Sequence, residues 1–134
     1  MKESKEKRSQ IMRAVKGKDT VPELLVRKLV YGLGYRYRLH GSNLPGKPDM
    51  YFSQKKKAIF IHGCFWHGHT CKRGDRTPST NSAYWINKIA KNKIRDNNTI
   101  RALSEDGWSI LVIWECDLKE IESLKYKVIS FLEN

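Results

Sequence analysis

The stretch Ala58-Ile-Phe-Ile-His-Gly-Cys-Phe-Trp-His-Gly-His-Thr-Cys71 joins an apolar run to a cluster of metal-ligating residues. Its first four residues form a continuous apolar segment, which is typical of a strand covered on both faces. The ten residues that follow contain three of the four histidines and two of the three cysteines in the chain. Because zinc prefers cysteine and histidine ligands, the stretch predicts a buried strand that ends at a zinc site.

The segments on both sides of this stretch predict an α/β fold, with a small mixed sheet and helices packed on it. Before it, the pattern predicts a helix from Asp19-Thr20 to Gly32–Gly34, strands at 35–39 and 49–52, and a turn at 55–57. After it, the pattern predicts a loop at 70–80, a helix from Asn81 or Ser82 to about 105, a strand at 108–114 and a helix at 121–132. The apolar positions expected to face the core are Leu25, Val26, Leu29, Val30 and Leu33 in the first helix and Trp85, Ile89 and Ile100 in the long one.

The charge of the chain favours a polyanionic partner. The 134 residues include 26 Lys and Arg against 14 Asp and Glu, a net charge of +12. A domain this basic gains binding energy by releasing counterions from nucleic acid, although an acidic protein or an anionic membrane surface would also attract it. The length fits one domain, which we expect at 19–134 after a basic arm at 1–18. The first ten residues lack the apolar segment of a secretory signal, and no apolar run reaches membrane-spanning length, so a cytoplasmic protein is expected.

The cysteines and histidines outnumber the four places of a zinc site. Spacing favours Cys64, His69 and Cys71, with Cys116 as a distant fourth ligand. This choice leaves His67 for catalysis. A set with His67 in place of His69 is also sterically reasonable, so the sequence leaves both sets open.

Asp49 follows a Pro-rich turn and opens a predicted strand. A hairpin with the strand at 58–61 would bring Asp49, the Ile61 carbonyl and His62 together at a sheet edge. A carboxylate and a carbonyl oxygen suit Mg²⁺, the ion that phosphodiester cleavage commonly needs. His67 or His62 could then activate water, because the pKa of histidine lies near neutrality.

Three other side chains have two readings each from the sequence. Asp96 lies within the long predicted helix, and its pattern favours a solvated charge paired with a neighbouring Lys or Arg. Phe65 and Trp66 are consecutive aromatics that could be core anchors or a wedge that stacks between bases.

Five segments together resemble the Vsr family of very short patch repair endonucleases. They are Met12-Arg-Ala14, Leu44–Asp49, Ile59–His67, Trp85–Asn92 with Arg95-Asp96, and Gly107–Cys116. The resemblance implies a bacterial DNA mismatch endonuclease with a restriction-endonuclease-like fold. Position 61 is Ile where the family often has Thr, and residues 60–62 occupy the place of the catalytic lysine of the wider nuclease superfamily.

The same resemblance implies a role for each matching residue. It assigns Asp49 and the Ile61 carbonyl to Mg²⁺, His67 to water activation, and His62 and Asp96 to support of the active site. It assigns structural zinc to Cys64, His69, Cys71 and Cys116. It assigns the aromatic wedge to Phe65, Trp66 and Trp85, intercalation from the other groove to Met12, and a possible supporting role to Glu23.

The substrate that the resemblance implies is double-stranded DNA with a T:G mismatch left by deamination of 5-methylcytosine. The enzyme would nick one strand 5′ of the thymine, for which a monomer is adequate. A nucleoid-associated bacterial protein linked to a cytosine-5 DNA methyltransferase and to mismatch-repair proteins is expected. Two alternatives are a zinc-stabilised DNA-binding module without catalysis and a nuclease of the same fold without mismatch specificity; a protein that binds an acidic partner accounts for the charge alone.

Overall fold

A computed structural model describes residues 20–65, 67, 69, 71 and 81–134 of the chain. The predicted arm at 1–18 with Met12, the side chain of Trp66 and the loop at 72–80 lie outside the described residues. The elements are α2 (Val21–Gly32), β1 (Arg38–Leu39), β2 (Met50–Phe52), β3 (Lys57–His62), α3 (Ser82–Glu105), β4 (Ser109–Trp114), a 3₁₀ turn η1 (Glu115–Lys119) and α4 (Ile121–Glu133). Of the described helices, none is long and apolar enough to cross a membrane.

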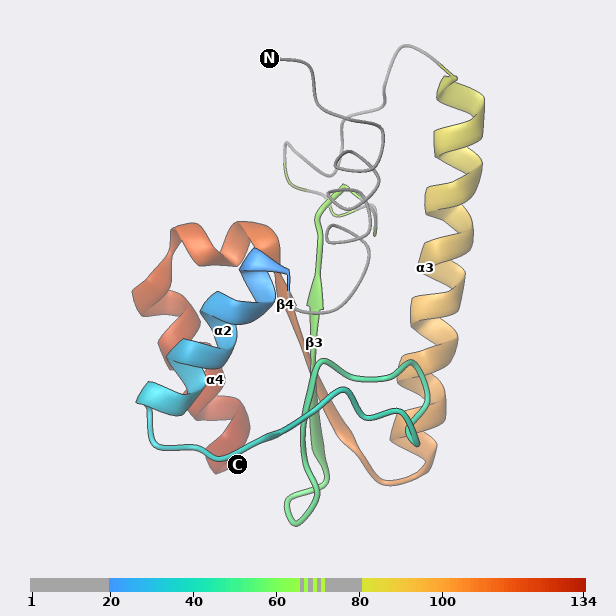
Figure 1. Ribbon diagram of the computed structural model, residues 1–134. Helices are drawn as coiled ribbons and strands as arrows, with labels where there is room; N and C mark the ends of the chain where they lie inside the picture. Colours follow the sequence, from blue (N-terminus) through green and yellow to red (C-terminus); the bar gives the residue numbers. More distant parts are fainter. Residues whose placement is uncertain (1–19, 66, 68, 70, 72–80) are drawn as a thin grey trace, which may run out of the picture.

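The four strands form one mixed sheet in the order β1-β2-β3-β4. Strands β1, β2 and β3 pair antiparallel, whereas β3 and β4 pair parallel. A parallel pair needs a long crossover, and α3 provides it. Figure 1 shows α2 and α4 on one face of the sheet and α3 on the other. The predicted mixed α/β fold is therefore confirmed.

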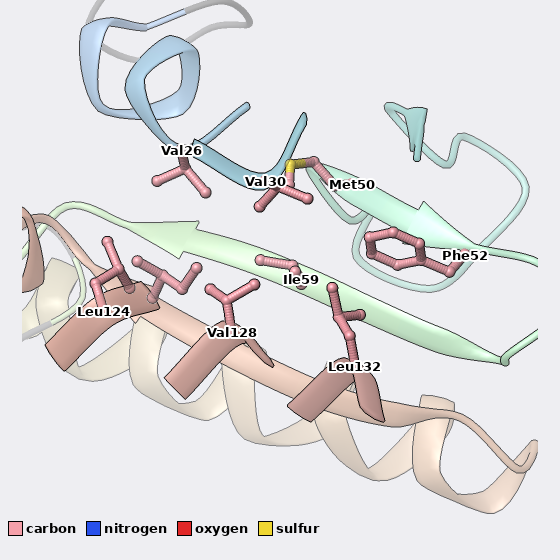
Figure 2. Close-up of a cluster of buried hydrophobic side chains, with 9 residues drawn as sticks. Val26, Val30, Met50, Phe52, Ile59, Leu124, Val128 and Leu132 are labelled. Atoms are coloured by element: carbon pink, nitrogen blue, oxygen red, sulfur yellow. The ribbon is translucent and has the colours of Figure 1, made fainter. Parts of the chain in front are cut away.

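The main core lies between the sheet and the pair α2 and α4 (Figure 2). Leu124, Val128 and Leu132 recur every four residues along α4, so they share the face of the helix that meets the sheet. The other buried members of this core are Val26, Val30, Met50, Phe52, Ile59 and Ile113. Each fully buried side chain of this kind contributes about 1.5–3 kcal/mol of transfer free energy.

Helix α3 packs differently from the prediction. Leu103, near its end, is buried, whereas Trp85, Ile89 and Ile100 are only partly buried. The reason is length: 24 residues of helix extend over about 36 Å, whereas a strand of six residues covers about 20 Å. Much of α3 therefore runs beyond the sheet and keeps its basic side chains in solvent.

Three further expectations are corrected by the structure. The strand expected at 35–39 is only Arg38–Leu39, at the exposed edge of the sheet. Leu25, expected in the core, is 50% exposed because Val26 and Val30 supply the face of α2 that meets the sheet. Lys57, expected in a turn, begins β3 and is buried, because its Nζ donates hydrogen bonds to the carbonyls of Phe131 and Asn134 at the end of α4. These bonds satisfy carbonyls that have no partner within the helix.

Candidate active site

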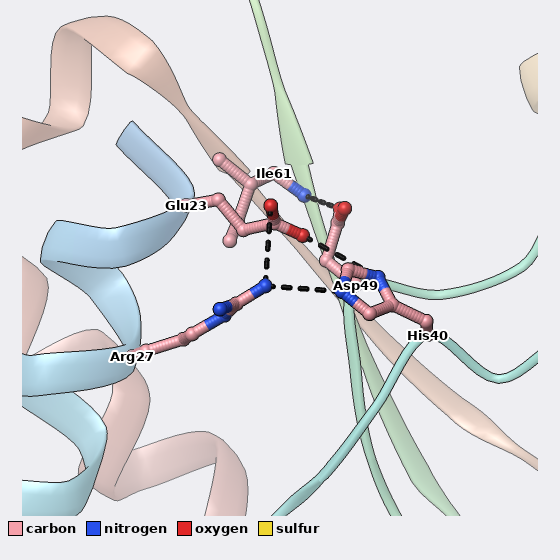
Figure 3. Close-up of polar contacts among 5 residues, drawn as sticks. All are labelled: Glu23, Arg27, His40, Asp49 and Ile61. Carbon is pink, nitrogen blue, oxygen red and sulfur yellow. Dashed lines mark hydrogen bonds and ion pairs between the residues drawn. The ribbon is translucent and has the colours of Figure 1, made fainter. Parts of the chain in front are cut away.

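Asp49 lies at the end of the loop that leads into β2, opposite the end of β3. The backbone N–H of Ile61 donates a hydrogen bond of 2.7 Å to Asp49 Oδ2 (Figure 3). The antiparallel register, in which Met50 faces Ile59, brings these two residues together. The hairpin thus places the Asp49 carboxylate at the end of a buried strand.

A second carboxylate lies beside Asp49. Glu23, in the first turn of α2, is 2% exposed, and its carboxylate lies 3.3 Å from Arg27 Nη2 and 3.8 Å from His40 Nδ1. Arg27 Nη2 is also 3.1 Å from His40 Nε2, so Arg27 and His40 surround one side of Glu23 (Figure 3).

Burial raises the pKa of Asp49 to about 7, and the Glu23 carboxyl adds to this shift. The Ile61 N–H and the Arg27 charge act in the opposite direction. The two buried carboxyl groups of Asp49 and Glu23 need positive charge nearby if both are to be ionised. A divalent cation with oxygen ligands supplies such charge, so the residues present fit Mg²⁺ at Asp49.

A second group of side chains lies on the α3 face of the sheet. His62 ends β3, and its ring stacks on that of His67 with centroids 3.8 Å apart and planes within 5°. His67 Nδ1 lies 2.6 Å from Asp96 Oδ2, in the middle of α3. The interpretation of Asp96 as a solvated helix charge is wrong, because its carboxylate pairs with a histidine from the loop after β3.

The electrostatics differ between the two histidines. His62 is 7% exposed, and its Nδ1 has no hydrogen-bond partner among the described residues. Burial lowers the pKa of His62 to about 4, and the neighbouring His67 contributes to this shift, so His62 is neutral at pH 7. When the Asp96 carboxylate accepts the Nδ1 proton of His67, Nε2 is left as a free base. The pair can therefore accept a proton from water.

The third group is the set of thiols with His69. Ligand atoms of Cys64, His69, Cys71 and Cys116 all lie within 4.8 Å of one another. Because β3 and β4 run parallel, their carboxyl ends meet at one edge, and Cys64 and Cys116 follow those two ends. The Cys116 N–H donates to Cys64 Sγ at 3.4 Å. The geometry groups His69 with the thiols and His67 with Asp96.

The donor set of this cluster fits zinc. Tetrahedral zinc, with bonds of about 2.3 Å to sulfur and about 2.1 Å to nitrogen, needs about 3.6 Å between neighbouring S and N ligands. Cys116 Sγ lies 3.5 Å from His69 Nδ1. The His69 ring also stacks on Trp114, with centroids 4.1 Å apart, which fixes its orientation. Burial raises the pKa of the Cys64 thiol to about 12 in the metal-free protein, so a cation is needed to hold it as a thiolate.

Aromatic side chains gather where this loop meets the start of α3. Phe65 contacts Trp85 edge-on, with ring centroids 5.4 Å apart, and Tyr84 packs against Trp85 at 5.1 Å. Phe65 and Trp85 thus lie together, whereas Trp66 and Met12 lie outside the described residues.

Three residues of the site have no strong signal in the sequence: Arg27, His40 and Trp114. Arg27 lies four residues after Glu23 in a predicted helix, a spacing that allows an ion pair. His40 is the one histidine outside the 62–71 stretch. Trp114 ends the second apolar strand, and its ring meets those of His62 and His69.

Comparisons with known proteins agree on one family. A family model described as DNA mismatch endonuclease Vsr matches residues 2–73. The DNA mismatch endonuclease Vsr of Escherichia coli is 41% identical over 117 residues, which cover 87% of this chain and 74% of that protein. The type II nicking enzyme V.XorIIP of Xanthomonas oryzae pv. oryzae is 41% identical over 130 residues, covering 97% and 95% of the two chains. The type II nicking enzyme V.NmeAIP of Neisseria meningitidis is 44% identical over 113 residues, covering 84% and 80%.

These matches define the protein first as an endonuclease that acts on DNA, and therefore as a hydrolase. More narrowly, the chain belongs to the Vsr family of DNA mismatch endonucleases. Its mixed sheet with helices on both faces agrees with that membership. The alternative prediction of a DNA-binding module without catalysis is therefore wrong.

Proposed function

We propose that the protein is a Mg²⁺-dependent endonuclease that nicks one strand of DNA 5′ of the thymine in a T:G mismatch. This activity would start very short patch repair of deaminated 5-methylcytosine. The observation that carries the proposal is the pair of His67 and Asp96. The His67 ring stacks on His62, which ends β3, and the preceding residue of β3, Ile61, donates a hydrogen bond to Asp49. We further infer that the sheet has the restriction-endonuclease-like arrangement.

In this proposal Asp49 and the Ile61 carbonyl hold Mg²⁺, and Glu23 supports Asp49. When bound, Mg²⁺ polarises the phosphate and stabilises the leaving oxygen. His67 Nε2 accepts a proton from the attacking water, while Asp96 holds the ring through Nδ1. Neutral His62 packs flat against His67 and keeps that ring in place without a competing charge.

We propose that Cys64, His69, Cys71 and Cys116 bind a structural zinc ion. Its role would be to tie the loop after β3 to the end of β4. That loop also holds His67, Phe65 and Trp66, so the ion would stiffen the part of the site that meets DNA. The donor spacing described above supports this assignment.

For mismatch recognition, we propose that Phe65, Trp66 and Trp85 form a wedge next to the mismatched pair. The packing of Phe65 on Trp85 supports a preformed aromatic surface. Met12, in an arm at 1–18, would enter from the other groove, and residues 19–134 would form the endonuclease domain. A nick needs one active site, so a monomer suffices. Functional links to a cytosine-5 DNA methyltransferase and to mismatch-repair proteins are part of the same proposal.

The test is a nicking assay on end-labelled duplexes that carry either a T:G mismatch or a matched T:A pair. Each duplex is incubated with Mg²⁺, without it, and with Mg²⁺ restored after brief chelation. We expect one nick, 5′ of the thymine, on the T:G duplex with Mg²⁺ only. Restoring Mg²⁺ distinguishes loss of this ion from loss of zinc. Cleavage of both duplexes would refute mismatch specificity, and cleavage without a divalent ion would refute the role of Mg²⁺.

A further inference from the structure

A groove with a volume of about 420 Å³ runs along α3 outside the histidine cluster. One wall is α3, and Pro45 in the loop before β2 forms part of the other. The loop approaches α3 closely, since a Cβ added to Gly46 would lie 2.2 Å from Thr99 Cγ2. Figure 1 shows this loop reaching the C-terminal half of α3. We call this feature the α3 groove.

The α3 groove combines the positive side chains of Lys91 and Arg95 and the neutral polar ones of Asn98 and Thr99 with apolar side chains such as that of Ile94. Lys91 and Arg95 lie four residues apart, so they are neighbours on one face of the helix, about 6 Å apart along its axis. Asn98 and Thr99 continue the same face by one turn. No acidic side chain lines the groove within the part of the chain that the structure describes.

The groove is next to both the histidine cluster with Asp96 and the loop that carries Asp49. Arg95 precedes Asp96 and is close enough for its charge to contribute to the low pKa of His62. On the other wall, the loop that carries Pro45 continues directly to Asp49. The groove is therefore next to the place where the proposed function would hold the scissile phosphate.

We propose that the α3 groove binds the sugar–phosphate backbone of the cut strand, with Lys91 and Arg95 each contacting a phosphate close to the scissile one. This inference rests on the proposed function. Lysine and arginine, together with amide and hydroxyl groups such as those of Asn98 and Thr99, are the side chains that hold DNA phosphates. Ile94 supplies an apolar surface suited to a deoxyribose ring. The described lining contains no aromatic ring on which a base could stack, so the groove suits the backbone rather than a base.

The test measures DNA binding without Mg²⁺, so that it does not depend on cleavage. The affinity of the wild type and of the variants Lys91→Ala and Arg95→Ala for the T:G duplex is followed across a range of salt concentrations. Each variant should bind about 3–10-fold more weakly and lower the slope of log K against log salt by about 0.9, the value for one lost phosphate contact. Arg95→Lys should keep the wild-type slope, because it keeps the charge.

Lys28→Ala is the matched control, since it removes one exposed positive charge from α2 on the opposite face of the sheet. Its slope should equal that of the wild type. If Lys28→Ala lowers the slope as much as the groove variants do, the effect is general electrostatics and the proposal is wrong. An unchanged slope for both groove variants would also overturn it.

Duplexes with single neutral methylphosphonates then locate the contacts. At one phosphate position, this substitution should weaken DNA binding by the wild type but have little further effect on binding by Lys91→Ala. At a different position, it should have little further effect on binding by Arg95→Ala. Both positions should lie on the cut strand near the nick; positions on the other strand would contradict the proposal. Failure of the wild type to nick a T:G duplex would instead refute the proposed function, while these binding measurements would still report on the groove.

Discussion

At the residue scale, Asp49 is the proposed metal ligand, and its buried position beside Glu23 disfavours the charged form of its carboxyl group. Its pKa is raised from 3.8 to about 7. Between these two pH values, Asp49 is largely protonated in the folded protein and largely ionised in the unfolded chain. Stability from this group is therefore present at low pH and is lost as pH rises toward 7. Without a bound cation, the ionised Asp49 carboxylate that metal binding requires therefore lowers the stability of the folded protein.

Asp49→Asn should therefore abolish nicking, by about 10³-fold or more, because the metal contact is lost. Without added Mg²⁺, it should also raise the melting temperature at pH 8 by about 3–6 °C, and by less at pH 5, where the wild-type carboxyl is largely protonated. The measurement is thermal unfolding of both proteins at the two pH values. An equal temperature difference at pH 5 and pH 8 would contradict the burial argument.

His67 and Asp96 should behave as one unit in catalysis. His67→Ala should slow nicking by about 10²–10⁴-fold, the usual contribution of a general base. Asp96→Asn should slow it less, because the asparagine can still contact the ring. In the double variant the losses should not add, since Asp96 acts through His67. Single-turnover rates of the three variants test this; losses that multiply in full would mean that Asp96 acts independently.

At the element scale, the contact between α3 and the loop before β2 positions Asp49 relative to Asp96. Gly46 permits this contact because its φ is +72° and because the space beside it is filled by Thr99. The two carboxylates are 47 positions apart in the chain, counted from 49 to 96. Their relation therefore depends on tertiary packing, to which this close approach of backbone to helix contributes.

Gly46→Ala should lower the melting temperature by several degrees, since both the backbone conformation and the contact with Thr99 are disfavoured. Nicking should also fall, because the displaced loop carries Asp49. Gly32→Ala is the control: its added Cβ meets nothing within 4 Å, so stability should be unchanged or slightly higher. Adding Thr99→Ala should recover part of the lost stability. Equal melting temperatures for Gly46→Ala and the wild type would refute this account.

At the scale of the whole molecule, the cluster of Cys64, His69, Cys71 and Cys116, which we propose binds zinc, joins the ends of β3 and β4 and the loop between β3 and α3. Cys116→Ser should lower the zinc content and the melting temperature, because bound metal contributes to the free energy of folding. Zinc analysis and thermal unfolding measure the two effects. Asp49→Asn, which leaves the cluster intact, should keep the wild-type zinc content. If Cys116→Ser also kept it, the four-ligand set would be wrong.

The local pattern of the sequence was enough for the order of the helices and strands. The apolar run at 58–61, the helix from Ser82 to Glu105 and the position of Asp49 at a strand start all depend on neighbours within a few residues. The placement of Cys64 and Cys71 in the thiol cluster is also local, whereas the tertiary structure grouped His69, rather than His67, with the thiols and added Cys116. Periodicity and turn residues carry this information because they reflect backbone preferences and the side chains' burial.

Packing between distant elements settled the rest. Asp96 meets His67 across 29 residues, and nothing in its helical neighbours distinguishes it from a solvated charge. Arg27 and His40 join Glu23 because α2 packs beside the loop before β2. Leu25 and much of α3 face solvent because the sheet covers only part of each helix. Such contacts depend on how helices and strands are placed in space, which a local pattern of residues does not encode.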